Sequence, residues 1–185
     1  MTNRCNWGNS NLDPLYRQYH DEEWGKLNLD NKYLYEMLVL ESFQSGLSWT
    51  TILKKRENFR KAFADFDYYQ VAKFDQTDFE RLMNDEGIVR NKLKINAAIN
   101  NAQVLVKLEQ SGTNLKQILQ EAIPEIIVNH PQEISDIPAQ TLLSKKLSVQ
   151  LKKIGFKFVG PTTMYSFLQA VGLINDHLDS CDFKY

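Results

Sequence analysis

Apolar residues recur at helical spacing along most of the chain, and a convincing alternation of apolar and polar residues, typical of strands, is absent. A first long helix is predicted from Asn31 to about Ser45, with apolar residues at every third or fourth position. Gly46 then breaks the pattern, and Ser48 can cap a second helix that continues to about Phe63.

The same signals predict helices in the second half of the chain. Thr77–Glu80 has the form of a capping box, and Gly87 ends the short helix that this box begins. Another helix starts near Val89, and two last helices end near Gly155 and Gly172. Together the elements predict an all-α fold.

Length and composition predict one globular domain over residues 1–185, either as one body or as two helical lobes that share a core. Hydrophobic residues make up 43% of the chain, which is enough for a sizeable core and too much for a disordered protein. No apolar run approaches the roughly 20 residues that span a bilayer, and the first residues lack the apolar stretch of a signal peptide. We therefore expect a cytoplasmic protein without a membrane partner.

The net charge of −1 neither supports nor excludes nucleic acid as a partner. The cations are clustered, however, and each cluster is either a solvated helix face or a phosphate-binding surface. The clusters are Lys54, Lys55, Arg56, Arg60 and Lys61; Arg90, Lys92 and Lys94; and Lys145, Lys146, Lys152, Lys153 and Lys157.

Cysteine and histidine residues gather near the two ends of the chain. Cys5 and His20 lie near the start, and His177 and Cys181 near the end, where their spacing predicts one face of a helical turn. The four residues have the composition of a closed structural zinc site. A disulfide between the cysteines, or two small buried side chains, are the alternatives that spacing leaves open.

Glu41 lies on the apolar stripe of its predicted helix, where a carboxyl group must find a partner or stay protonated. Glu36, five residues earlier, is predicted to face solvent. Two explanations of a buried acid at position 41 remain open, which are a functional role and an ion pair within the core. Aromatic side chains that stack on bases and attract cations cluster in the same quarter of the chain. They are Trp7, Tyr16, Tyr19, Trp24 and Trp49.

With these motifs the chain resembles the DNA-3-methyladenine glycosylase I family, a branch of the helix-hairpin-helix DNA glycosylases. The matching segments are Arg4-Cys5-x-Trp7, Asp13-Pro14-Leu15-Tyr16-x-x-Tyr19-His20-Asp21-x-Glu23-Trp24-Gly25, Leu40-Glu41-x-x-Gln44-x-Gly46-Leu47-Ser48-Trp49, Lys54-Lys55-Arg56-Glu57-Asn58, Gly155-Phe156-Lys157-Phe158-Val159-Gly160 and Asn175-Asp176-His177.

The resemblance implies a monomeric enzyme that excises N3-methyladenine from alkylated double-stranded DNA. It implies that Glu41 contacts the extruded base, that the five aromatic residues form the base pocket, and that the turn from Gln44 to Leu47 enters the DNA stack. It also implies that Cys5, His20, His177 and Cys181 bind one structural zinc ion. No lysine is evident that would cleave the strand, so a monofunctional enzyme is expected.

Further DNA contacts follow from this interpretation. Leu47, beside Gly46, is the expected apolar wedge that fills the space left by the base. Backbone N–H groups after Gly87 are expected to hold a phosphate. Cationic side chains are expected to add unspecific phosphate contacts, and they are Lys54, Lys55, Arg56 and Arg90.

Some residues depart from the usual family pattern. Ser42 and Phe43 replace a smaller pair, so we expect a bulkier wall beside Glu41. The hairpin around Gly87 keeps only one glycine. Asp136 and Asp176 are candidates for an assisting acid by type alone, and Asp176 is expected to support His177.

Two other functions compete with the glycosylase. A zinc hydrolase needs an open metal position, which four protein ligands would deny. A non-catalytic module that recognises damaged DNA would keep its function after the substitution Glu41→Gln, whereas a glycosylase would lose excision or base selectivity.

Overall fold

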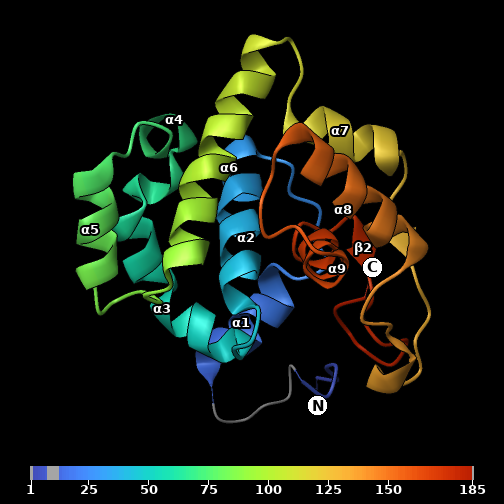
Figure 1. Ribbon diagram of the computed structural model, residues 1–185. Coiled ribbons are helices and arrows are strands. Elements are labelled where there is room, and N and C mark those ends of the chain that lie inside the picture. Colours follow the sequence, from blue (N-terminus) through green and yellow to red (C-terminus); the bar gives the residue numbers. More distant parts are fainter. Residues whose placement is uncertain (1, 8–12, 185) are drawn as a thin grey trace.

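The computed structural model describes residues 2–7 and 13–184, and these are mostly helical (Figure 1). The helices are α1 (Pro14–Glu22), α2 (Asn31–Gln44), α3 (Trp49–Ala62), α4 (Tyr68–Val71), α5 (Gln76–Asn84), α6 (Lys92–Gln110), α7 (Leu115–Ala122), α8 (Leu142–Ile154) and α9 (Pro161–Ala170). Short 3-10 turns cover Ala64–Phe66 and Ile134–Asp136. The remaining regular elements are β1 (Ile127–Val128) and β2 (Ile174–Asn175), which pair in parallel.

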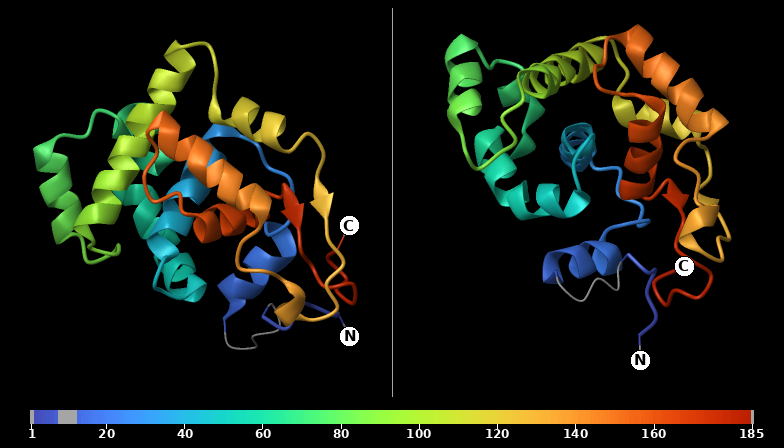
Figure 2. Two further views of the ribbon diagram at one scale, coloured as in Figure 1. Left: turned by 45° about the vertical axis from the view of Figure 1, so that its right-hand side comes forward. Right: turned by 60° about the horizontal axis from the view of Figure 1, so that its bottom comes forward.

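Helix α2 is the centre of the fold, and seen end-on it is surrounded by the other helices (Figure 2). Asp30 caps its first turn, and a run of ten successive residues from Leu34 to Phe43 is buried. A helix that is buried on all sides must carry apolar residues around its whole circumference. The predicted boundary at Ser45 is one residue late, because the helix ends at Gln44.

Two helix starts differ from the prediction by a few residues. The capping box of α5 is formed by Asp75 and Asp78, not by Thr77 and Glu80, because the Asp75 carboxylate accepts from the backbone of Asp78. Helix α6 begins at Lys92 rather than near Val89, since the Asn91 side chain accepts from the N–H of Lys94 and caps the helix there.

Helices α8 and α9 pack against one another and are joined by a turn over residues 155–160. Gly155 ends α8 with a φ of 117°, and Pro161 begins α9. Gly172 follows α9 with a φ of 76°, and a Cβ atom there would lie 2.1 Å from the backbone of Lys26. Only glycine fits this close approach, which places the segment after α1 against the end of α9.

The N- and C-terminal segments lie close together (Figure 2). A large hydrophobic cluster extends from α2 to α9, and a smaller one contains Cys5, Tyr19, Trp24, Leu53, Leu178 and Cys181. The described residues contain no helix that is long and apolar enough to cross a membrane.

Candidate functional site: an aromatic cavity beside a Cys/His cluster

A cavity of about 200 Å³ opens between α1, α2, α3 and α9. All six residues predicted for the base site, Glu41 and the five aromatic residues, line it. Its walls are Trp7, Tyr16, Tyr19, Trp24, Glu41, Gln44, Trp49, Ser166 and Gln169. Segments far apart in the sequence therefore meet around one space of the size of a single base.

Glu41 reaches this cavity from the last turn of α2 and is only 5% exposed. No hydrogen bond joins its carboxyl group to any of the described residues, so an acidic group is buried without a partner. Burial raises the pKa of Glu41 to about 8. A carboxyl group in this state gains most when a cation or a strong hydrogen-bond donor enters the cavity.

The aromatic walls are held by contacts with each other. The ring of Trp7 lies 5.1 Å from that of Tyr16 and 4.7 Å from that of Trp24. Tyr19 and Trp49 form a second pair at 5.1 Å. The Nε1 atom of Trp49 is buried, and none of the described residues accepts its hydrogen bond. The aromatic rings thus form the walls of the cavity and hold one another in place.

Ser166 and Gln169 are cavity residues that sequence reasoning did not identify. They lie three residues apart on α9, so they share one face of that helix. The spacing was readable from the sequence, but the packing of this face against α2 was not.

The expectation of a bulkier wall from Ser42 and Phe43 is wrong. Ser42 points away from the cavity and donates to the carbonyl oxygen of Leu38 at 2.7 Å. The Phe43 ring packs in the core, 4.8 Å from that of Phe59. Both side chains leave α2 on faces other than the one that carries Glu41.

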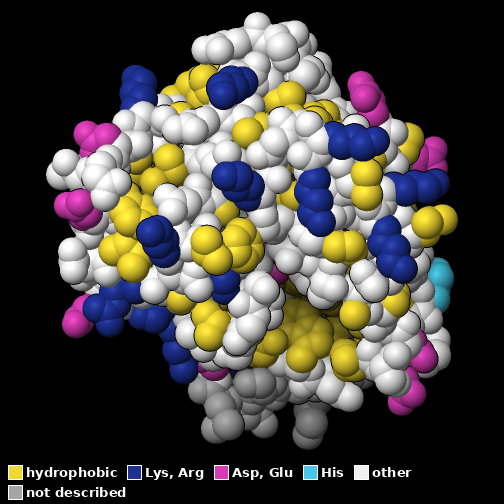
Figure 3. Space-filling model, viewed as in Figure 1, with side chains coloured by type: hydrophobic (Ala, Val, Ile, Leu, Met, Phe, Trp, Pro, Cys, Tyr) yellow, Lys and Arg dark blue, Asp and Glu magenta, His cyan; other side chains and the backbone are white. Residues whose placement is uncertain are grey.

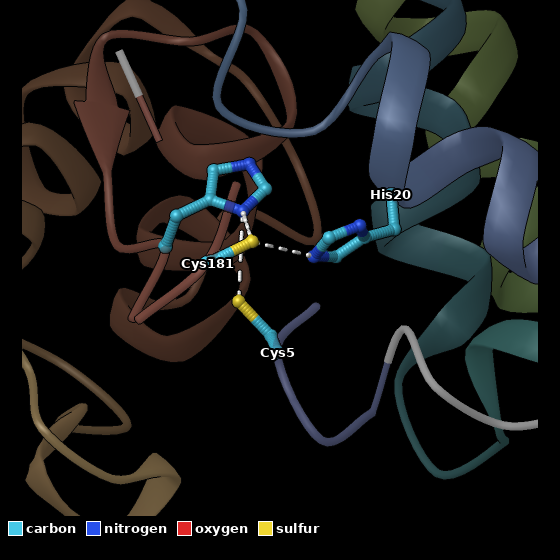
Figure 4. Close-up of side chains that lie close together, drawn as sticks. Cys5, His20 and Cys181 are labelled. Carbon is cyan, nitrogen blue, oxygen red and sulfur yellow. Dashed lines mark hydrogen bonds between the residues drawn. The ribbon is translucent and has the colours of Figure 1, made fainter. Parts of the chain in front are cut away.

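Cys5, His20, His177 and Cys181 converge from the two ends of the chain (Figure 4), and all four are buried. Their ligand atoms all lie within 4.8 Å of one another. The sulfur of Cys181 is 3.4 Å from Nδ1 of His177 and 3.7 Å from Nε2 of His20. A tetrahedron of Zn–S and Zn–N bonds has S···N edges of about 3.5 Å. The group therefore fits a metal ion, and the two cysteines form no disulfide.

Both histidines hold a proton on the nitrogen that faces away from the sulfur atoms. Nδ1 of His20 lies 2.7 Å from Asp21, whose carboxylate is also held by Arg4. Nε2 of His177 donates to the carbonyl oxygen of Trp24 at 2.9 Å. Burial lowers the pKa of His177 to about 4, so its ring is neutral at pH 7. Each ring thus directs a lone pair at the cluster, as a metal ligand must.

Two predictions about this cluster are corrected. Asp176 does not support His177, because its carboxylate binds Tyr165 and Gln169, and Asp21 is the acid that orients a histidine of the cluster. The segment from His177 to Cys181 forms turns rather than a helical turn.

The cluster also braces the cavity. The ring of His20 lies 4.8 Å from that of Trp7, and the ring of His177 lies 4.6 Å from that of Trp24. Two cavity walls therefore rest directly on two of the four candidate metal ligands.

The turn after α2 projects outward beside the cavity. Gly46 has a φ of 80°, a Cβ atom there would meet no other residue within 4 Å, and Leu47 is 39% exposed. The Gln44 side chain donates to the carbonyl oxygen of Leu47 at 3.0 Å and closes the turn. Lys94 of α6 donates to the carbonyl oxygens of Phe43 and Ser45 and so fixes the end of α2.

The prediction that Arg56 contacts phosphate is wrong. Arg56 is 9% exposed and binds Glu23 and Glu36 at 2.8 Å each. Glu36 also pairs with Arg60 and is itself buried, so its predicted exposure is wrong too. These charges stabilise the contact between α2 and α3 and are not available to a ligand.

The other predicted phosphate contacts lie at the surface but differ in availability. Lys54 pairs with Asp13 at 3.1 Å. Lys55 donates to the carbonyl oxygen of Glu86 at 3.0 Å, and the N–H of Gly87 is taken by Asp85. Arg90 is exposed, with a long contact of 3.9 Å to Glu86. The hairpin amide of Gly87 is therefore already satisfied by the protein.

The turn between α8 and α9 matches an open phosphate site better than the hairpin around Gly87 does. Gly160 caps α9 without a side-chain hydrogen bond, and no described residue accepts from the N–H groups of Thr162 and Thr163. The carbonyl oxygen of Phe158 in this turn accepts from Ser42, the neighbour of Glu41. The glycines at 155 and 160 were visible in the sequence, but their proximity to α2 was not.

The comparisons with known proteins agree on one family. The model of the methyladenine glycosylase family matches residues 7–185. DNA-3-methyladenine glycosylase 1 of Escherichia coli (strain K12) is 47% identical over 96% of this chain and 95% of its own length. The DNA-3-methyladenine glycosylase of Haemophilus influenzae is 40% identical over 100% of this chain and 99% of its own.

Solved structures show the same similarity in three dimensions. A crystal structure of 3-methyladenine DNA glycosylase I superposes with a TM-score of 0.94 at 43% identity and covers 97% of this chain and 98% of its own. A variant of 3-methyladenine DNA glycosylase I in complex with 3-methyladenine superposes with a TM-score of 0.92 at 38% identity, over 97% of each chain. This chain belongs to the methyladenine glycosylase family.

Proposed function

We propose that this protein hydrolyses the N-glycosidic bond of N3-methyladenine in alkylated double-stranded DNA, as a monofunctional enzyme of base-excision repair. The observation that carries the proposal is the unpartnered, buried carboxyl group of Glu41 in an aromatic cavity that holds one base. The names of the relatives, and the 3-methyladenine bound in a similar structure, support the same substrate.

Selection of a cationic base explains the composition of the cavity. Methylation at N3 gives adenine a positive charge and weakens its glycosidic bond, so the enzyme needs to bind and position the base more than to activate it. Tyr16, Tyr19 and Trp49 attract the cationic ring through their π faces. Glu41 accepts a hydrogen bond from the base and, when ionised, stabilises its charge.

Extrusion of the base brings Glu41 and its target together. A base inside the duplex cannot reach the cavity, so it must leave the stack, at a cost of a few kcal/mol that is lower for damaged pairs. We infer that Leu47 enters the space left behind, with Gly46 and Gln44 shaping its turn. No lysine lines the cavity among the described residues, which accords with hydrolysis without strand cleavage.

We infer that DNA lies across the face drawn in Figure 3, where Lys and Arg side chains are spread over α6 and α8 and a hollow with hydrophobic walls opens below α9. The open amides at the start of α9 and the nearby Lys157 are the phosphate contacts that we favour over the occupied amide of Gly87.

We further propose that Cys5, His20, His177 and Cys181 hold one structural zinc ion. Four protein ligands leave no position for a reactive water molecule, so the zinc ion would tie the chain ends together rather than take part in hydrolysis.

The first test measures release of free base from methylated duplex DNA, separated by chromatography, for the wild type and Glu41→Gln. Release of N3-methyladenine without strand nicking, and at least a roughly 100-fold loss in the variant, is the expected result. The matched control is Glu121→Gln, which removes an exposed carboxylate from α7. A folded wild type that binds methylated DNA but releases no base would identify a damage-binding module instead.

A further inference from the structure

Gln169 lines the same cavity as Glu41, and its amide is held in one orientation. Its side chain is 8% exposed, and Nε2 donates to Oδ2 of Asp176 at 2.7 Å. A carboxylate only accepts hydrogen bonds, so nitrogen must be the atom on that side. The oxygen Oε1 is consequently the atom that remains for the cavity, and none of the described residues donates to it.

Asp176 is in turn fixed by its surroundings. It is 1% exposed, and its carboxylate accepts from the hydroxyl of Tyr165 at 2.6 Å and from Nδ2 of Asn129 at 2.6 Å. Burial raises the pKa of Tyr165, so its hydroxyl group remains a donor. With Gln169 the carboxylate has three donors, all from neutral side chains, and no freedom to rotate.

This chain of hydrogen bonds changes what the cavity wall offers to a ligand. A donor bound to a carboxylate group is polarised, which makes the oxygen of the same amide a stronger acceptor. Glu41 and Gln169 therefore both present acceptors to one small space, and the Asp176 side chain holds the Gln169 amide from behind the wall. Such a site favours a ligand that carries donors and positive charge.

Resting on the proposed function, we propose that Gln169 is a specificity-determining residue whose Oε1 accepts a hydrogen bond from the exocyclic amino group of the extruded adenine. Asp176 is its positioning residue, because it sets the orientation of the amide. Neither residue takes part in bond cleavage. The amino group has two hydrogens, so Glu41 and Gln169 can each accept one of them.

The same geometry discriminates against bases that carry a carbonyl group in place of the exocyclic amino group of adenine. Guanine and hypoxanthine carry an oxygen where adenine carries the amino group. That oxygen would face the acceptor of Gln169, and two acceptors without a hydrogen between them repel and remain unsatisfied. The polar group of the wall thus selects adenine-type bases more effectively than shape alone.

The test compares two free bases, 3-methyladenine and 3-methylhypoxanthine, which share the N3-methyl group and differ in the group at C6 and in one ring N–H. Their dissociation constants are measured by tryptophan fluorescence with the wild type, with Gln169→Leu, and with Gln110→Leu as the same change at an exposed site at the end of α6. Gln169→Leu should bind 3-methyladenine about 10- to 100-fold more weakly. The ratio of the two dissociation constants, which measures the preference for 3-methyladenine over 3-methylhypoxanthine, should fall at least about fivefold in the same variant. Gln110→Leu should match the wild type.

A purely structural role of Gln169 would weaken both bases equally, and an unchanged ratio would overturn the inference. Asp176→Asn gives a second readout, because an amide in place of the carboxylate no longer dictates which way Gln169 points. The variant should lose the same preference while its bound metal content stays at the wild-type level. Excision by the wild type is assayed alongside, since its absence would overturn the proposed function without deciding the selectivity measured with free bases.

Discussion

Glu41 and Arg56 are both ionisable residues buried on core helices, and they differ in whether another side chain pairs with them. Arg56 has two carboxylate partners, so its charge is neutralised inside the protein. Glu41 has none among the described residues, and its carboxyl group faces the cavity. A buried acid without a partner destabilises the fold unless it stays protonated, which is tolerable where the group serves a ligand.

The pKa of Glu41 predicts how excision depends on pH. The value of about 8 means that the carboxyl group of the free protein is mostly protonated at pH 6 and ionised above pH 8. Because the ionised form attracts the cationic base, kcat/KM should rise about tenfold per pH unit below pH 8 and level off above it. Single-turnover excision between pH 5.5 and 9 measures this profile.

Glu41→Gln is the control for this profile, since its side chain cannot ionise. Its residual excision should vary little over the same pH range. If the variant kept the slope of the wild type, another group would be responsible and the role of Glu41 in binding the cation would be refuted.

Replacement of Arg56 should affect stability rather than phosphate binding. Arg56→Met removes the Arg partner of Glu23 and leaves Glu36 with Arg60 alone, and removing one member of a buried ion pair costs about 3–5 kcal/mol. Urea unfolding of this variant is compared with Lys61→Met, which removes an exposed cation from the same helix and should change stability by less than about 0.5 kcal/mol. Equal stability of the two variants would contradict the buried network.

At the scale of elements, the end of α2 is where the core meets the wedge turn. The last carbonyl groups of a helix have no partner within it. Lys94 satisfies two carbonyl oxygens at this end from the first turn of α6 and is itself buried. The second helix of the α5–α6 pair thereby holds the turn that carries Leu47, although it does not contact the cavity.

Lys94→Met should loosen this turn without altering the cavity walls. We expect a loss of about 1–3 kcal/mol in stability, because two carbonyl groups lose their donor. We also expect reduced base extrusion, measured by the fluorescence of 2-aminopurine next to the lesion. Lys92→Met removes an exposed cation one position into the same helix and should leave stability unchanged. Equal effects of both variants would mean that Lys94 contributes charge and not structure.

At the scale of the whole molecule, a metal ion held by the Cys/His cluster would close a loop that includes almost the entire chain. On the scale used for disulfides, closure of such a loop stabilises the folded state by about 5 kcal/mol. The cluster also supports Trp7 and Trp24, so loss of a metal ion should affect both stability and the cavity.

Cys181→Ser should therefore lower the Tm strongly and weaken the binding of 3-methyladenine, whereas Ser180→Ala, at the exposed neighbouring position, should do neither. Bound zinc is quantified by mass spectrometry, and the spectrum of cobalt-substituted protein reports whether the site is closed and tetrahedral. A wild type that contains no metal and is insensitive to chelators would refute the structural zinc.

Patterns within a few residues of one another were sufficient to predict much of this protein. Helical periodicity, the cap at Ser48 and the break at Gly46 depend on local backbone chemistry, which is why they agree with the structure. The members of the Cys/His set and of the aromatic cavity were predicted through the resemblance to a known family, because spacing alone left other roles open for both groups.

Only the tertiary structure decided which groups meet. The sequence could not tell that Arg56 and Glu36 pair inside the core, that Asp21 rather than Asp176 orients a histidine of the cluster, or that Gln169 lines the same cavity as Glu41. Each of these contacts joins residues that only the packing of the helices brings together. The ion pair or hydrogen bond follows from that packing. The local sequence determined the helices and which functional groups the chain contains. The folded arrangement determined which of these groups are free to act on a base.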